Sequence, residues 1–465
     1  MPIITHLITQ QRRDGQHDFY KQVIIIRMKD IVLTDLINQQ KVGRSQKFIL
    51  SICLLLMIMD GYDIQAMAYA APIIIDIWEV EKAMLGVVFS ASLLGLFIGS
   101  LVLSSLSDRF GRRPILLFST LAFSVLMLVT PHVHTIEQLA AMRLVTGIFL
   151  GGIMPNAMAY SAELVPYKYR IRTMMIISCG YTVGAMLGGA ISAVLIPIGG
   201  WQAIFYFGGI IPLILFAIMF FKLPESLQFL STHPKNDRSI IRNLKRFYPS
   251  LNLDENRKIF RNTAPEAKQS PLDLFRNKRA FFTSSIWIIS VLNMISLYFL
   301  ANWLPTLANQ SGLSLNQSLL IGSTLLFGGT FGTLLMGFKI DKFGFYKVLL
   351  PIFVLAVASI AMIGYSVNHL NLLFVVVFLA GFTIVGGQPA INALSASFYP
   401  ASLRTTGVGW SIGIARLGSV IGPLLGGYLS QSMSINHLFL VAAVPSLLVV
   451  GMLSIQAKYK QPAST

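Results

Sequence analysis

Long apolar runs alternate with short polar turns along almost the whole chain, beginning near residue 48. A helix needs about 20 consecutive apolar residues to cross the hydrocarbon core of a bilayer. Runs of about this length occur at 48–75, 86–106, 114–131, 139–163, 173–198, 201–221, 280–304, 317–338, 347–367, 370–396, 406–430 and 437–456. The pattern predicts an all-α membrane protein with twelve transmembrane helices.

Composition and charge support this prediction. Apolar residues make up 54% of the 465 residues and charged residues 12%, which excludes an ordinary soluble domain. The net charge of +17 would suit a nucleic-acid partner, but thirty-three of the 36 Lys and Arg residues fall in segments that are cytoplasmic if the N-terminus is inside. Only Lys82 falls outside, while Arg143 and Arg416 lie within spans. This asymmetry follows the positive-inside rule, so we expect both termini in the cytoplasm and no nucleic-acid partner.

A polar segment divides the spans into six and six. We expect a cytoplasmic N-terminal segment (1–47), a six-helix bundle (48–221), a basic cytoplasmic linker (222–279), a second bundle (280–456) and a cytoplasmic tail (457–465). Met28 is an alternative start to Met1, which would make 1–27 an extension.

The two halves are related by an internal repeat. The segment 107–111 after the second span recurs as 340–344 after the eighth, an offset of 233. An offset of 234 aligns Gly147, Gly152, Pro155, Ala159, Ser161, Ala162, Pro166 and Arg170 with Gly381, Gly386, Pro389, Ala393, Ser395, Ala396, Pro400 and Arg404. Parallel repeats of this kind are a transporter architecture, with the substrate site between the halves and alternating access by rocking.

Two carboxylates interrupt the first span. Asp60 and Asp63 lie on one face of the helix because they are three residues apart. An ionised Asp at the bilayer centre costs roughly 2.5–3.5 kcal/mol, so such acids face a cavity, pair with a cation or carry protons. The helical rise brings Asp63 to the depth of Arg143 and Asp60 to that of Arg416.

Several of these residues resemble motifs of a known transporter family. The major facilitator superfamily carries a loop signature between helices two and three that is similar to Gly99, Asp108, Arg109, Gly111, Arg112 and Arg113. Asp60-Gly61-Tyr62-Asp63, Arg143 with its following glycines, and Arg416 resemble the aromatic acid:proton symporter branch. The resemblance implies two six-helix bundles related by a pseudo-two-fold axis. It also implies a multi-pass protein of the bacterial inner membrane that imports benzoate-, hydroxybenzoate- or muconate-like acids with protons.

The resemblance and the depths together suggest roles for the charged residues. We expect Asp60 and Asp63 to couple protons, Arg416 to hold the substrate carboxylate, and Arg143 to support Asp63 as an ion pair. Static ion pairs, and a packing role for Arg416, remain open alternatives. Further candidates for substrate binding are Asp60, Tyr62, Asn156, Tyr160, Asn293, Gln388 and Asn392.

A second charged group lies at the predicted cytoplasmic ends of the helices. We expect it to act as a gate that latches the two halves, and its members are Asp108, Arg109, Arg112, Glu163 and Asp341. Phe345 and Tyr346 replace the paired arginines in the second half, so we expect a weaker latch there.

Other functional classes fit the sequence less well. No phosphate-binding loop is present, which favours an ion gradient over ATP. No catalytic or metal-ligating cluster converges outside the spans, so we do not expect an enzyme, and we expect neither a cofactor nor a metal. We also expect the protein to be a monomer. A proton antiporter that exports drugs or metabolites is an alternative, because Gly418-x-x-x-Gly422-Pro423-x-x-Gly426-Gly427 resembles a run typical of exporters, although on helix eleven instead of five. A membrane sensor of aromatic acids is a third possibility.

Overall fold

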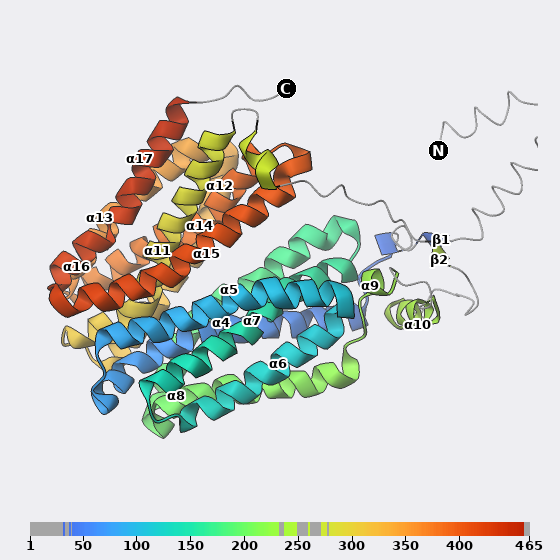
Figure 1. The fold of residues 1–465 in the computed structure, drawn as a ribbon, viewed down its shortest axis with the longest axis horizontal. Coiled ribbons are helices and arrows are strands. Elements are labelled where there is room, and N and C mark those ends of the chain that lie inside the picture. Colours follow the sequence, from blue (N-terminus) through green and yellow to red (C-terminus); the bar gives the residue numbers. More distant parts are fainter. Residues whose placement is uncertain are drawn as a thin grey trace, which may run out of the picture.

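The computed structural model describes residues 31–32, 37–38, 40–231, 237–248, 259–260, 271–276 and 279–459. The predicted extension 1–27, parts of the linker 222–279 and the end of the tail lie outside these residues. Within the described residues, the protein is built from long helices that form two bundles lying side by side, blue to green and yellow to red in Figure 1.

The first half of the chain forms five long helical segments. They are α4 (Arg44–Trp78), α5 (Lys82–Phe110), α6 (Arg112–Val129), α7 (Ile136–Leu164) and α8 (Tyr167–Lys222). A short 3-10 turn, η1 (Thr130–His132), precedes α7. The helix α8 contains the fifth and sixth predicted spans, because Gly199 and Gly200 leave helical geometry between them, with Gly200 at φ +64°. Glycine allows this break because it has no Cβ.

The second half repeats this arrangement. It consists of α11 (Ala280–Gln310), α12 (Leu315–Phe343), α13 (Phe345–Ser366), α14 (Leu370–Phe398), α15 (Ala401–Ser432), α16 (Ile435–Ala442) and α17 (Val444–Lys458). The last two helices share the twelfth predicted span. Eleven helical stretches of the described residues are long and apolar enough to cross a membrane, and the longest holds two spans.

The linker contributes short elements between the halves. They are α9 (Leu227–Ser231), α10 (Asp237–Phe247), the two-residue strand β2 (Ile259–Phe260) and the 3-10 turn η3 (Pro271–Phe275). The strand β2 pairs in parallel with β1 (Ile31–Val32) of the N-terminal segment. The apolar side of α10 is buried, and the Gln46 side chain donates hydrogen bonds to the Tyr248 hydroxyl (2.8 Å) and the Leu164 carbonyl (2.6 Å). This part of the linker therefore packs on the first half.

Close helix contacts repeat between the halves. A Cβ at Gly99 of α5 would collide with the carbonyl of Ile148 on α7, and a Cβ at Gly332 of α12 with that of Phe382 on α14. The α4–α8 contact at Gly184 recurs in the same way between α11 and α15 at Gly418. Small residues let helix backbones approach in a membrane, where association depends on packing. The glycines that recur in the sequence repeat thus allow the same close helix contacts in both halves.

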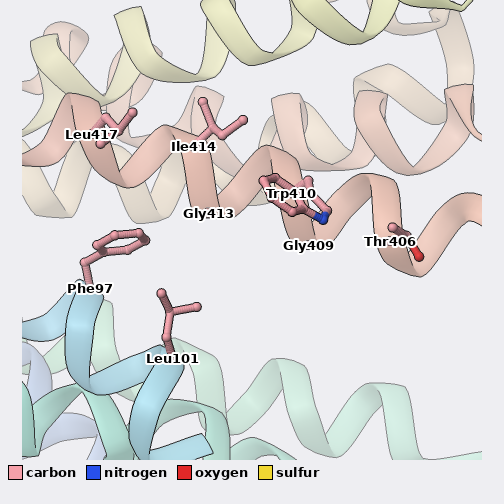
Figure 2. A pocket seen from close by; sticks show the side chains of 8 residues that line it. All are labelled: Phe97, Leu101, Thr406, Gly409, Trp410, Gly413, Ile414 and Leu417. Carbon is pink, nitrogen blue, oxygen red and sulfur yellow. The ribbon is translucent and has the colours of Figure 1, made fainter. Parts of the chain in front are cut away.

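The halves meet at one end and separate at the other. We term the end that carries the Arg- and Lys-rich turns after α5, α7 and α12 the basic end. Towards the opposite end, Ser90 donates to the Val420 carbonyl (2.7 Å), and the Phe89 ring packs edge-on against Trp303. Towards the basic end, an apolar groove lies between α5 and α15, and Figure 2 shows Phe97 and Leu101 facing the α15 side chains across it.

Candidate functional site

The two acids of α4 lie at a tight crossing of helices. Gly61, between them, lets α4 approach α8 so closely that a Cβ would collide with the Tyr181 carbonyl. Asp60 and Asp63 are both buried, with side chains at most 1% exposed. The two carboxylates nevertheless have very different partners.

Asp63 is saturated by Arg143 of α7. The guanidinium binds the carboxylate in a bidentate pair, with Nη1–Oδ1 at 2.7 Å and Nη2–Oδ2 at 2.8 Å. Nη2 also donates to the Asp63 carbonyl (3.3 Å) and to the Ser92 hydroxyl (3.1 Å). Such fork-to-fork pairs are strong and geometrically specific. The structure thus joins the two residues that the depth argument paired, and it buries them away from the central cavity.

Asp60 has no such partner. Neither of its carboxylate oxygens has a hydrogen-bond partner in the part of the chain that the structure describes, and Oδ1 is buried. Its side chain lines a central cavity together with Arg416 of α15, with which it interacts electrostatically. The Arg416 guanidinium forms no hydrogen bond or ion pair with any described residue, so its donors are available to an anion in the cavity.

The cavity lies between the halves. It has a volume of about 520 Å³, within the range of small-molecule sites. Its walls come from α4, α5, α7, α8, α11, α12, α14 and α15, and they are mainly apolar. The polar side chains on these walls are Asp60, Gln65, Ser100, Tyr181, Thr182, Tyr298, Gln388, Asn392 and Arg416. The two phenols, Tyr181 and Tyr298, line the same cavity as the charged side chains of Asp60 and Arg416.

Amide side chains form a second polar group on the wall from the second half. Asn293 of α11 donates to Gln388 of α14 (2.8 Å), and Gln388 donates to Asn392 one turn later (3.2 Å). Gln388 and Asn392 line the cavity, whereas Asn293 is fully buried behind them.

Three predicted cavity residues lie elsewhere. Tyr62 donates to the Ile204 carbonyl (3.0 Å), Asn156 to the Gly152 carbonyl (2.7 Å) and Tyr160 to the Pro224 carbonyl (3.0 Å), and none of them lines the cavity. In this structure the three side chains therefore do not face the cavity. Each of the three side chains points into the first half, where it donates to a backbone carbonyl.

The charged residues at the basic end also differ from expectation. Arg112 pairs with Asp108 (2.9 Å) and Glu163 (3.4 Å), and all three belong to the first half. Arg109 stacks on Phe110, and no ion pair joins Asp341 to any other described residue. The cluster therefore does not latch the two halves here, because the basic ends of α5 and α15 stand apart.

Sequence reasoning missed several residues at these sites. Glu225 accepts hydrogen bonds from the backbone amides of Arg112 (3.0 Å) and Arg113 (3.2 Å), and so caps the start of α6. Thr182 lines the cavity at the position that the repeat equates with Arg416. The offset of 234 could have identified Thr182, whereas the cap by Glu225 depends on how the linker folds back.

Comparison with known proteins places this fold in a family. The family model of the Major Facilitator Superfamily matches residues 53–332 and 286–464, which together span most of the chain. The chain belongs to the Major Facilitator Superfamily. The superfamily comprises membrane transporters, so the protein is a multi-pass membrane transporter and not an enzyme.

Relatives within this superfamily are similar over most of their length. The 4-hydroxybenzoate transporter PcaK of Acinetobacter baylyi is 34% identical over 89% of this chain and 92% of its own. The gallate transporter of Pseudomonas putida is 33% identical over 90% of this chain and 93% of its own. The benzoate transport protein of Acinetobacter baylyi is 27% identical over 90% of this chain and 91% of its own.

Solved superfamily structures share the fold. A bacterial homolog of the human lysosomal transporter Spinster, in an inward-facing and occupied conformation, has a TM-score of 0.73 at 15% identity over 91% of this chain and 100% of its own. The D-xylose-proton symporter has a TM-score of 0.67 at 16% identity, over 87% and 96%.

Proposed function

We propose that this protein is a proton-coupled importer of aromatic carboxylates that works by alternating access. One observation carries the proposal: the unpartnered Asp60 carboxylate shares a cavity between the two halves with Arg416, whose donors are free. The names of the relatives, which transport 4-hydroxybenzoate, gallate and benzoate, support the choice of substrate class.

The two groups act together in the proposed cycle. Arg416 binds the substrate carboxylate through its planar fork, which matches a carboxylate better than a lysine would. A proton on Asp60 removes the repulsion between the two negative charges in the cavity. Substrate and proton are therefore loaded together, and release of one favours release of the other. Gln388 and Asn392 line the same cavity from the opposite half.

Asp63 and Arg143 have a supporting role in this proposal. Their pair is bidentate and about 1% exposed or less, and neither residue lines the cavity. It holds α4 against α7 while Asp60 exchanges partners. We therefore assign the proton to Asp60 alone, although the sequence suggested that both acids carry protons. The pairs of Asp108 and Glu163 with Arg112 stabilise the basic end of the first half, whereas Asp341 makes no ion pair with any described residue of the second half.

The arrangement in the cell belongs to the same proposal. The charge asymmetry supports a bacterial inner-membrane location, with both termini and the basic end in the cytoplasm. In that orientation the separated basic ends correspond to an inward-facing state. We propose that the transporting unit is a monomer, because the cavity is complete within one chain.

Uptake into proteoliposomes with an imposed pH gradient tests the function. The wild type should accumulate labelled benzoate when the outside is acidic. Asp60→Asn should lose gradient-driven accumulation and retain exchange of benzoate across the membrane, because the amide fills the site but carries no proton. The matched control is Asp76→Asn, an exposed acid on the same helix, which should behave as the wild type.

Each other outcome points to a different conclusion. Full accumulation by Asp60→Asn would contradict the proposed role of Asp60. Exchange of substrate outward against incoming protons would indicate an exporter, and binding without transport would indicate a sensor.

A further inference from the structure

The amide groups on the second-half wall have a defined direction. Asn293 is fully buried, and its Nδ2 donates to the Ile384 carbonyl (3.2 Å) as well as to Gln388 Oε1 (2.8 Å). A backbone carbonyl can only accept. The Asn293 side chain therefore presents its NH₂ group to Ile384 and Gln388, and its Oδ1 is buried without a hydrogen-bond partner among the described residues.

The orientation of the Asn293 amide determines the orientation of the next amide in the row, that of Gln388. Because Asn293 donates to Gln388 Oε1, the Gln388 side chain must point its NH₂ group the other way. There it donates to Asn392 Oδ1 (3.2 Å). The Asn392 oxygen thus accepts one hydrogen bond, and the Asn392 NH₂ group has no hydrogen-bond partner among the residues described. Asn392 is partly exposed and lines the cavity, so the row ends in a donor available to a ligand.

The first half has no such donor at the equivalent positions. The offset of 234 aligns Gln388 and Asn392 with Met154 and Met158, which line the same cavity. The cavity is therefore asymmetric. Asp60 and Arg416 place charges on one part of its wall, the methionines offer an apolar surface, and Asn392 offers a hydrogen-bond donor.

We infer that Asn392 donates a hydrogen bond to an oxygen substituent on the aromatic ring, so that the transporter favours hydroxylated benzoates over benzoates with an apolar substituent of the same size. This inference rests on the proposed function. Asn293 and Gln388 act as positioning residues, because they orient the Asn392 amide. A site that binds a substrate hydroxyl discriminates against an analogue that lacks it.

Competition in proteoliposomes tests this inference. The measured quantity is the ratio of the concentrations of 4-methylbenzoate and 4-hydroxybenzoate that halve exchange of labelled benzoate. The methyl and hydroxyl groups have similar size, but only the hydroxyl oxygen accepts a hydrogen bond. The wild type should prefer 4-hydroxybenzoate by roughly fivefold, the value of one typical hydrogen bond. It should also bind 4-methoxybenzoate better than 4-ethylbenzoate, because the ether oxygen still accepts.

Variants test whether the Asn392 amide itself, and not the shape of the cavity, causes the preference for a ring oxygen. Asn392→Leu, which keeps the size of the side chain, should reduce the ratio to near one while benzoate exchange continues. Asn293→Leu should lower the ratio although Asn293 does not touch the cavity, because Gln388 and Asn392 are then free to turn. The matched control is Asn371→Leu, which replaces an exposed amide at the start of the same helix outside the cavity and should leave the ratio unchanged.

The outcomes distinguish this inference from the proposed function. A ratio near one in the wild type, or an unchanged ratio in Asn392→Leu, would overturn the inference while proton-driven benzoate uptake still upheld the function. Failure of the wild type to exchange any aromatic carboxylate would overturn both. The comparison of ligands on the wild type needs no variant, so a misfolded variant would not remove the test.

Discussion

The two halves of this transporter share their helix packing but differ in their polar chemistry. Close contacts at Gly99 and Gly184 recur at Gly332 and Gly418. The repeat equates Asp60 with Asn293, however, and a carboxylate in one half thus corresponds to an amide in the other. Duplication preserved the contacts that hold helices together, while the residues facing the centre diverged. We infer that the first half supplies the proton-carrying acid and the second the groups that recognise the substrate.

The buried ion pair is the largest difference between the halves. Asp63 and Arg143 correspond to Ser296 and Val377 in the second half, which packs without a charge at this depth. Removing one partner of a buried pair costs about 3–5 kcal/mol, because the other charge remains buried. Arg143→Val should therefore destabilise the protein by about this amount, measured as a lower midpoint of unfolding in detergent.

Replacing both Asp63 and Arg143 by their second-half equivalents should restore most of the lost stability. The double variant Asp63→Ser, Arg143→Val leaves no unpaired charge, so its midpoint should lie well above that of Arg143→Val alone. If the single variant unfolds like the wild type, the pair does not stabilise the first half.

The glycine contacts should be equally sensitive in both halves. Gly99→Leu and Gly332→Leu each force a side chain against a neighbouring carbonyl, and each should cost about 1–3 kcal/mol. The control is Gly337→Leu on α12, where a Cβ would meet no atom within 4 Å. Unfolding midpoints and the yield of folded protein in membranes measure this effect. A loss confined to one half would contradict the equivalence of the two packings.

The charged cluster at the basic end should have the smallest effect. Arg112→Phe copies Phe345 of the second half and removes the pairs with Asp108 and Glu163. Partly exposed ion pairs contribute little, so we expect a loss of roughly 1 kcal/mol. The initial rate of uptake should change, while the order of preference among competing carboxylates should not. A changed order would show that the cluster influences the cavity.

Much of the architecture was predictable because it depends on local patterns. The twelve spans follow from apolar runs, and the break between the fifth and sixth occurs at Gly199 and Gly200, between the two predicted runs. The contact between Asp63 and Arg143 follows from depth alone, since a buried charge in a membrane needs an opposite charge at the same level.

The composition of the cavity was harder to predict because it depends on helix rotation. Tyr62, Asn156 and Tyr160 are as polar as Gln388 and Asn392, and they lie at similar positions in their spans. They nevertheless donate to backbone carbonyls within the first half and do not line the cavity. A single sequence gives the depth of a residue in a helix, but a turn of a few tens of degrees decides which neighbour it meets.

The sequence by itself determined that the chain crosses the membrane repeatedly, that its halves are duplicates, and that acids and arginines lie within the spans. These properties depend on the cost of transferring each segment into lipid, which is set by its own residues. Only the tertiary structure decided that Asp63 is saturated while Asp60 is unpartnered, and that the amide row ends in a free donor at Asn392. Hydrogen-bond partners come from other helices, and their distances and orientations exist only once the helices have packed.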